Sequence, residues 1–238
     1  MATEKTGPAE AVISADRLHE AEKFIEQEEG ARSRFHGWLG VGITVLAVAM
    51  SLFHFYAAFF VIPPETLRAV HVGAALVLIF LLYPVARRFR HRLMPWDVLL
   101  ALAAIGTIAY LLLGGDELRD RGSLPNRTDM IVGTIFILLV LEGCRRSTGL
   151  VMVSVVVLFI LYGLFGNHLP QPWTHRGYDL ERMVGHLYIT LEGIFGSAVD
   201  VSATLIILFT IYGAVLNATG AGKFFIDFSF AAMGGKPA

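Results

Sequence analysis

Charged residues and cysteine are both scarce in this sequence. Only 16% of its 238 residues are Asp, Glu, Lys or Arg, whereas a typical soluble domain carries about 25%. The formal net charge of -1 offers no basic surface of the kind that binds nucleic acid, so no nucleic-acid partner is expected. Cys144 is the only cysteine, which excludes an internal disulfide and a cysteine-rich metal site. A small residue near a helix end is a sufficient explanation for it.

The short motifs of common enzymes are also missing. The sequence contains no G-x-S-x-G, no phosphate-binding glycine loop with its lysine and no H-x-x-x-H pair, which are the usual signatures of a nucleophile, a nucleotide site or a metal site on a helix. We therefore expect no catalytic residue, no metal site and no cofactor bound in this portion, and the chain is not expected to be an enzyme.

Long apolar runs are what the sequence has instead. Hydrophobic residues make up 55% of the chain, and the mean hydropathy is +0.62. A membrane-spanning helix needs ~20 mostly apolar residues, with a range of about 17 to 25. The pattern predicts an all-α integral membrane protein, in contact with membrane lipid, with about six transmembrane helices. They are expected at residues 37–62, 67–86, 96–113, 130–143, 150–165 and 199–218.

The positions of Lys and Arg predict the orientation. Cytoplasmic loops carry an excess of these residues. If the N-terminus is cytoplasmic, nine of the counted Lys and Arg residues flank the spans on the inside and six on the outside. The densest cluster, in residues 87–92, then also lies inside. We therefore expect a multi-pass protein of a bacterial inner membrane with both ends in the cytoplasm.

Three segments are expected along the chain. Residues 1–36 are mixed in charge and rich in Glu, unlike a cleaved signal peptide, and contain a weak apolar stripe that predicts a short amphipathic helix. Residues 37–146 form a four-helix membrane unit, with a solvated outer loop at 114–129. Residues 147–238 contain two spans joined by a long outer segment. Part of that segment, residues 180–195, is amphipathic enough to lie along the membrane surface. A soluble partner on the outer side could dock on the long outer segment, residues 166–196.

Several ionisable residues fall within or near the apolar runs, where such residues are costly. His54 and His71, on neighbouring helices, leave open a haem- or quinone-binding anchor of an electron-transfer complex as the alternative function. Glu142 is expected to pair with nearby arginines, and Asp97 to interact with the start of its own helix.

A second group of polar and small residues lies in and around the last span. Glu192 and Asp200 have two open interpretations: a turn residue and a helix cap, or a polar surface that contacts substrate or partner. Asn217 and Thr210 lie on a face of small residues and are expected to bond to neighbouring helices.

The stretch that includes these residues resembles a known family. It contains His186-Leu187-Tyr188-Ile189-Thr190-Leu191-Glu192-Gly193-Ile194-Phe195-Gly196, then Val201-Ser202-Ala203-Thr204, and then Thr219-Gly220-Ala221-Gly222 before Phe224-Phe225. Together these elements are similar to the fused membrane component of TRAP transporters (tripartite ATP-independent periplasmic transporters). The closest type is the TAXI-associated one, in which small and large subunits share a chain.

The resemblance implies a function that composition does not. Members of this family take up organic acids and related solutes by symport with an ion, commonly sodium, without ATP, and receive the solute from a periplasmic solute-binding protein. The first four helices then correspond to the small subunit, and residues 147–238 to the beginning of a large permease domain. The remainder of that domain, with the ion and substrate sites, is expected beyond this chain. Glu192, Gly193, Gly196, Asp200 and Asn217 are expected to form the substrate or partner surface.

Overall fold

The computed structural model describes residue 35, residues 37–85 and residues 93–234. The expected N-terminal amphipathic helix and the arginine cluster at residues 87–92 lie outside the described residues. Within them the chain is helical and contains no strand, which confirms the all-α class. The longer helices are α2 (Trp38–Phe59), α3 (Pro64–Leu82), α4 (Pro95–Asp120), α5 (Arg127–Ser147), α6 (Leu150–Phe165), α7 (Leu180–Tyr188), α9 (Ile207–Ala218) and α10 (Ala221–Met233), and the shorter ones are η2 (Arg121–Ser123), η3 (Gly166–His168), α8 (Ser197–Val201) and the π-helix η4 (Ser202–Ile206).

The helix ends follow from local chemistry. Pro64 and Pro95 occupy the first turns of α3 and α4, where the missing N–H of proline is not needed. Asn126 caps α5 through a reciprocal pair of bonds with Asp129, which satisfies backbone N–H groups that the first turn leaves free. Gly220, with φ of 71°, separates α9 from α10, because glycine adopts this left-handed conformation without steric cost.

Five helical stretches of the described residues are long and apolar enough to cross a membrane: Trp38–Phe59, Pro64–Leu82, Pro95–Asp120, Leu150–His168 and Ser197–Ala218. The sixth expected span is present as helix α5, but it does not meet the same criterion. Its 21 residues include charged groups near both ends, among them Asp129 and Glu142, so the uninterrupted apolar part is short.

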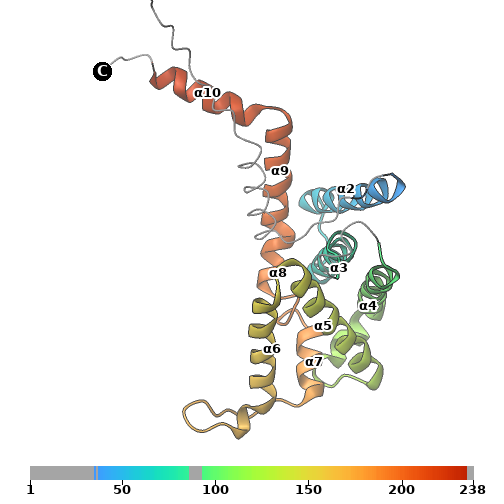
Figure 1. Cartoon of the computed structure of the whole chain (residues 1–238). Helices are drawn as coiled ribbons and strands as arrows, with labels where there is room; N and C mark the ends of the chain where they lie inside the picture. The colour runs from blue at the N-terminus through green and yellow to red at the C-terminus, as the bar shows by residue number, and fades with distance from the viewer. Residues whose placement is uncertain (1–34, 36, 86–92, 235–238) are drawn as a thin grey trace, which may run out of the picture.

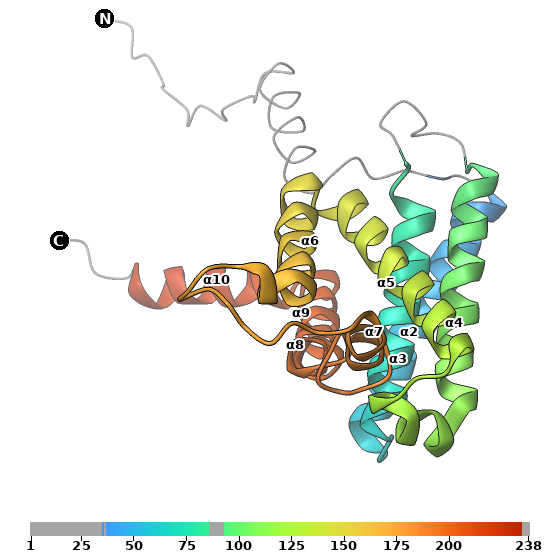
Figure 2. The same ribbon diagram turned by 90° about the horizontal axis from the view of Figure 1, so that it is seen from below.

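Two expectations about loops need correction. The predicted outer loop from Gly114 is helical as far as Asp120, apart from a kink at Gly115, where φ is 52°. The chain after Gly220, for which no helix was expected, forms α10. Figure 1 shows α10 turning away from the end of α9, and Figure 2 shows it extending away from the other helices.

The buried core lies among α3, α4, α5 and the segment that begins with α7. Phe80 on α3, Ala104 on α4 and Phe136 on α5 are 1%, 0% and 0% exposed. Tyr188 and Phe195 join the same cluster from beyond residue 147. The segment between the last two expected spans is therefore part of the core of the helices before it.

Candidate functional site

The glycine-rich turn between α7 and α8 holds most of the predicted surface residues. A Cβ on Gly193 would collide with backbone atoms of His186 and Leu187, and a Cβ on Gly196 would lie 2.9 Å from the carbonyl oxygen of Gly193. Both positions therefore need glycine because the chain folds back tightly on the end of α7. Glu192 lies exposed on this turn, and its backbone N–H donates to Oγ1 of Thr190 at 3.2 Å.

Aromatic packing fixes this turn against the helices of the core. Phe195 stacks on Phe136 with ring centroids 5.3 Å apart and planes at 20°. Tyr188, whose ring also contacts Phe136, donates from its hydroxyl to the buried carbonyl oxygen of Thr107 on α4, at 2.5 Å. Since a buried hydroxyl needs a hydrogen-bond partner, this bond fixes the position of α7 relative to α4.

A close contact between α5 and α7 also holds α7 in place. Gly133 on α5 faces Val184 and Tyr188, and a Cβ at this position would lie 2.6 Å from Cγ1 of Val184. Only glycine allows this approach, because helices can pack closely where a side chain is absent. The segment is thus held by a glycine contact, an aromatic cluster and a buried hydrogen bond.

Asp200, at the other end of the turn, is paired with α3. Its Oδ1 lies 2.9 Å from Nη2 of Arg68 and 3.0 Å from Nε. Arg68 also donates from Nη1 to the carbonyl oxygen of Phe195 at 3.0 Å. Arg68 on α3 therefore bonds both to the end of the turn, at Phe195, and to Asp200 in α8. In the sequence this residue contributed only to the charge count, although a lone arginine within an apolar run signals a paired group.

Asn217 lies at the far end of α9 from Asp200. It is exposed. Thr210, which was expected to bond to a neighbouring helix, instead donates its hydroxyl to the carbonyl oxygen of Ile206, one turn earlier along its own segment. The structure therefore brings Glu192, Gly193 and Gly196 together on one turn, with Asp200 in the helix α8 that follows it, but does not bring Asn217 to them. The role of these residues as a substrate or partner surface stays a prediction.

The two histidines bond directly to each other. Nδ1 of His71 lies 3.0 Å from Nε2 of His54, Nε2 of His71 lies 3.1 Å from Oγ of Ser202, and Nδ1 of His54 lies 2.7 Å from the carbonyl oxygen of Met50. No space remains between the facing nitrogens for an iron atom, so the arrangement does not support the haem alternative. Among the described residues, no three His, Cys, Asp or Glu side chains lie close enough to hold a metal ion.

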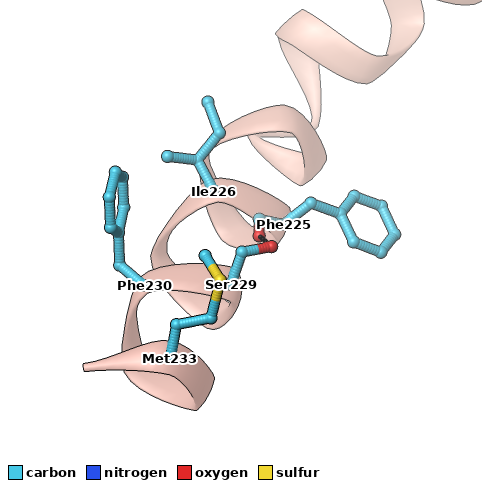
Figure 3. Close-up of a pocket in the computed structure, with 5 residues that line it drawn as sticks. All are labelled: Phe225, Ile226, Ser229, Phe230 and Met233. Carbon is cyan, nitrogen blue, oxygen red and sulfur yellow. Dashed lines mark hydrogen bonds between the residues drawn. The ribbon is translucent and has the colours of Figure 1, made fainter. Parts of the chain in front are cut away.

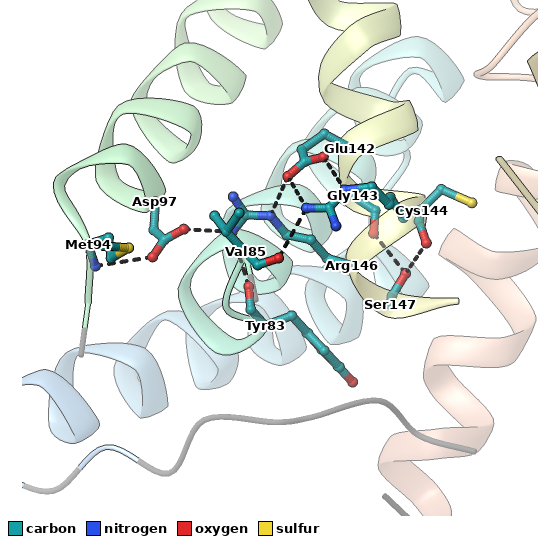
Figure 4. Close-up of polar contacts among 10 residues, drawn as sticks. Tyr83, Val85, Met94, Asp97, Glu142, Gly143, Cys144, Arg146 and Ser147 are labelled. Carbon is teal, nitrogen blue, oxygen red and sulfur yellow. Dashed lines mark hydrogen bonds and ion pairs between the residues drawn. The ribbon is translucent and has the colours of Figure 1, made fainter. Parts of the chain in front are cut away.

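The opposite end of the bundle carries a second polar cluster (Figure 4). Arg146 on α5 donates to Oδ1 of Asp97 at 2.7 Å and to Oε1 of Glu142 at 2.8 Å, and its side chain is fully buried. The expected pairing of Glu142 is confirmed, as is the bond between Asp97 and the start of its own helix, through the backbone N–H of Met94. The bond from Asp97 to Arg146 was not expected, because nothing in the sequence places residues 49 positions apart side by side.

Arg146 has further contacts that explain its tolerance of burial. It donates to the carbonyl oxygen of Tyr83 at 3.0 Å, and its guanidinium carbon lies 5.2 Å from the ring centroid of Phe80, a cation–π distance. Nη2 is the one buried side-chain nitrogen or oxygen without a hydrogen-bond partner in the part of the chain that the structure describes. This cluster joins the ends of α3, α4 and α5, so its role is to hold these helices together.

A shallow groove on α10 is lined by Phe225, Ile226, Ser229, Phe230 and Met233 (Figure 3). All five side chains come from one helix, and the hydroxyl of Ser229 donates to the carbonyl oxygen of Phe225. No polar group of this groove is left to orient a ligand, so it is an exposed apolar helix face.

Residues 135–238 match the family model of the tripartite ATP-independent periplasmic transporter, DctM component. The match begins within α5 and covers every helix after it. Searches of curated proteins and of solved structures gave no significant match. The match supports a TRAP-type permease, that is, the membrane component of a transporter, and this transporter family is not enzymatic. The matched residues include the glycine-rich turn and Asp200, the partner of Arg68.

Proposed function

We propose that this chain is part of the membrane component of a TRAP-type secondary transporter with small and large subunits fused, of the TAXI-associated type. In this proposal an ion gradient, commonly of sodium, drives uptake of an organic acid or related solute. The single observation that carries the proposal is the family match over residues 135–238. The apolar helices support a multi-pass membrane protein.

The way the matched segment sits on the earlier helices supports the fused arrangement. Asp200 pairs with Arg68 on α3, and Tyr188 bonds to Thr107 on α4. Such polar contacts fix one relative position of packed helices. A permease that moves solute needs a fixed part against which another part moves, and α2–α5 with α7 supply such a part in this proposal.

Two partners follow from this assignment. A periplasmic solute-binding protein is proposed to dock on the outer side, at the segment between α6 and α8, where Trp173 and Tyr178 are 67% and 52% exposed. The remainder of a larger permease domain is proposed to cover α9 and α10. Neither of these helices buries a residue among those described, and apolar faces of this size occur where lipid or protein covers them.

Disruption of the gene tests the proposal. Cells in which the reading frame of this chain is interrupted should lose accumulation of one radiolabelled organic acid from a panel of dicarboxylates, sugar acids and amino acids. Uptake should return with a plasmid copy and should fall when a sodium ionophore collapses the gradient while ATP is maintained. Unchanged uptake across the whole panel, or uptake that follows ATP alone, would contradict the proposal.

Cysteine labelling tests the proposed inner-membrane orientation with a cytoplasmic N-terminus. In a Cys144→Ser background, single cysteines at Asp116 and His175 should react with a membrane-impermeant maleimide added to intact spheroplasts. A cysteine at Arg90 should react only after lysis. The reverse pattern would overturn the proposed orientation.

A further inference from the structure

A chain of hydrogen bonds connects three helices near the start of the last span. It runs from the carbonyl oxygen of Met50 through His54 and His71 to the hydroxyl of Ser202, with heavy-atom distances of 2.7, 3.0 and 3.1 Å. His54 and His71 are 1% and 9% exposed. Histidines are rare inside membrane proteins, and where they form such chains they commonly carry protons.

No unpaired charge lies on the helices packed around the two rings. Helices α2 and α9 and the π-helix η4 contain no acidic or basic residue apart from His54 itself. On α3 and α8, Arg68 and Asp200 neutralise one another at 2.9 Å, and Glu65 pairs with Arg119 at 3.1 Å. The charge of this site is therefore decided by the protons on its own two imidazoles.

The bond to the carbonyl oxygen of Met50 fixes the direction of every hydrogen bond in this series when both rings are neutral. A carbonyl oxygen only accepts, so Nδ1 of His54 carries a proton and donates to Met50. Nε2 of neutral His54 is then an acceptor, so Nδ1 of His71 must donate to it. Nε2 of His71 is in turn an acceptor, and Ser202 must donate its hydroxyl proton. Both rings are therefore Nδ1–H tautomers, and Ser202 is a donor.

The same geometry has room for one further proton. A proton added at Nε2 of His71 turns that nitrogen into a donor to Oγ of Ser202, and the hydroxyl hydrogen rotates to a carbonyl of the preceding helical turn, as serine commonly does in helices. All three heavy-atom contacts survive. A second proton would place an N–H group of each ring against the other at 3.0 Å, with two positive charges in a buried site, and the contact between α2 and α3 would open.

We propose that His54, His71 and Ser202 form a binding site for a single proton, which enters from water and switches Ser202 from donor to acceptor. Ser202 is the first residue of the π-helix η4, which leads directly into α9. Short π-helical turns occur often at functional sites. The bound proton therefore acts at the joint between the helices α2 and α3 and the span that follows the turn.

Nitrogen-15 NMR of histidine-labelled protein in lipid nanodiscs tests the proposal without a transport assay. Signals are assigned with single His→Gln variants. At about pH 8 both rings should show the Nδ1–H tautomer, whereas free histidine favours Nε2–H. On stepwise acidification from there, the two rings should share one proton in a single step. Two Nε2–H tautomers, independent uptake of two protons with the ring contact intact, or no uptake at all would overturn the proposal.

Ser202 variants separate a proton switch from a packing role. Ser202→Ala should move the midpoint of the shared step by about half a pH unit or more, because a hydrogen bond to a charged ring is stronger than one to a neutral ring. Ser202→Thr should restore the midpoint. Ser154→Ala is the matched control, since that hydroxyl bonds only to the carbonyl oxygen of Leu150, and it should leave the step unchanged. An unchanged midpoint in a folded Ser202→Ala variant would contradict the assigned role of Ser202.

Discussion

Two regions of this chain both consist of apolar helices but differ in how many residues those helices bury. Helices α3, α4 and α5 each bury six or seven residues, and Asp97 on α4 pairs with Arg146 on α5 inside the bundle. Helices α6, α9 and α10 bury none among the described residues, although α6 and α9 are more hydrophobic than α5. Hydrophobicity alone therefore does not tell which helix packs against protein and which presents itself to lipid or to further helices.

What distinguishes the packed region is its small and polar residues. Gly133 and Gly73 sit where a Cβ would meet a neighbouring helix within 3.0 Å, and Asp97 and Arg146 bond across the bundle. On α9, Gly213 has no atom within 4 Å of where a Cβ would be. In a membrane, where lipid is as apolar as leucine, close approach and polar bonding decide which helices associate. Substitutions at buried or closely packed positions, each with a control at an exposed position, test this difference.

Asp97→Asn should lower the stability of the folded protein more than the other substitutions proposed here. The change leaves buried Arg146 with a charge balanced only by Glu142, and loss of one partner from a buried ion pair costs about 3 kcal/mol or more. Thermal unfolding of the purified protein in detergent should therefore shift to lower temperature by several degrees. Asp116→Asn, at a side chain 94% exposed, is the control and should leave the midpoint unchanged. Equal midpoints for the two variants would remove the distinction between buried and exposed pairs.

Gly133→Ala should lower the stability of the folded protein by an intermediate amount. The added methyl group would lie 2.6 Å from Val184, so α5 and α7 must separate, and overpacking of this kind costs about 1–3 kcal/mol. Gly213→Ala is the matched change on α9, where helix propensity alone predicts no loss and a gain of up to about 1 kcal/mol. The same melting experiment measures both. A more damaging substitution at Gly213 than at Gly133 would mean that α9 is the more tightly packed helix.

Separation of Arg68 from Asp200 should have the smallest effect on stability. Asp200 is 42% exposed at its side chain, so solvent screens the pair, and a coupling energy of about 1 kcal/mol is expected from a double-mutant cycle of Arg68→Gln and Asp200→Asn. Hydrogen exchange should rise at residues 196–206 in each single variant. Lys223→Gln, an exposed change on α10, should alter neither quantity. Strictly additive effects of the two substitutions would show that this pair does not hold the turn.

The positions of the helices could be predicted from the sequence because apolar runs and proline stops are local signals. The ranges at α2, α3 and α6 agree with the structure within a few residues. The pairing of Glu142 with Arg145 was likewise predictable from spacing along one helix. Long-range contacts were not, because Arg68 with Asp200 and His71 with Ser202 join residues more than 130 positions apart. Helix α10 was not predicted, because the expected span ends at residue 218 and the 13 residues of α10 are too few to cross a membrane.

Reconstitution tests the central claim, that this chain is part of the membrane component of a TRAP-type transporter, most directly. The membrane protein encoded by the gene is placed in proteoliposomes with an imposed ion gradient and no ATP, and its solute-binding protein, loaded with radiolabelled organic acid, is added outside. The account predicts accumulation of the acid that requires both the gradient and the binding protein. Accumulation that needs neither, or none under any gradient with a folded membrane protein, would contradict it.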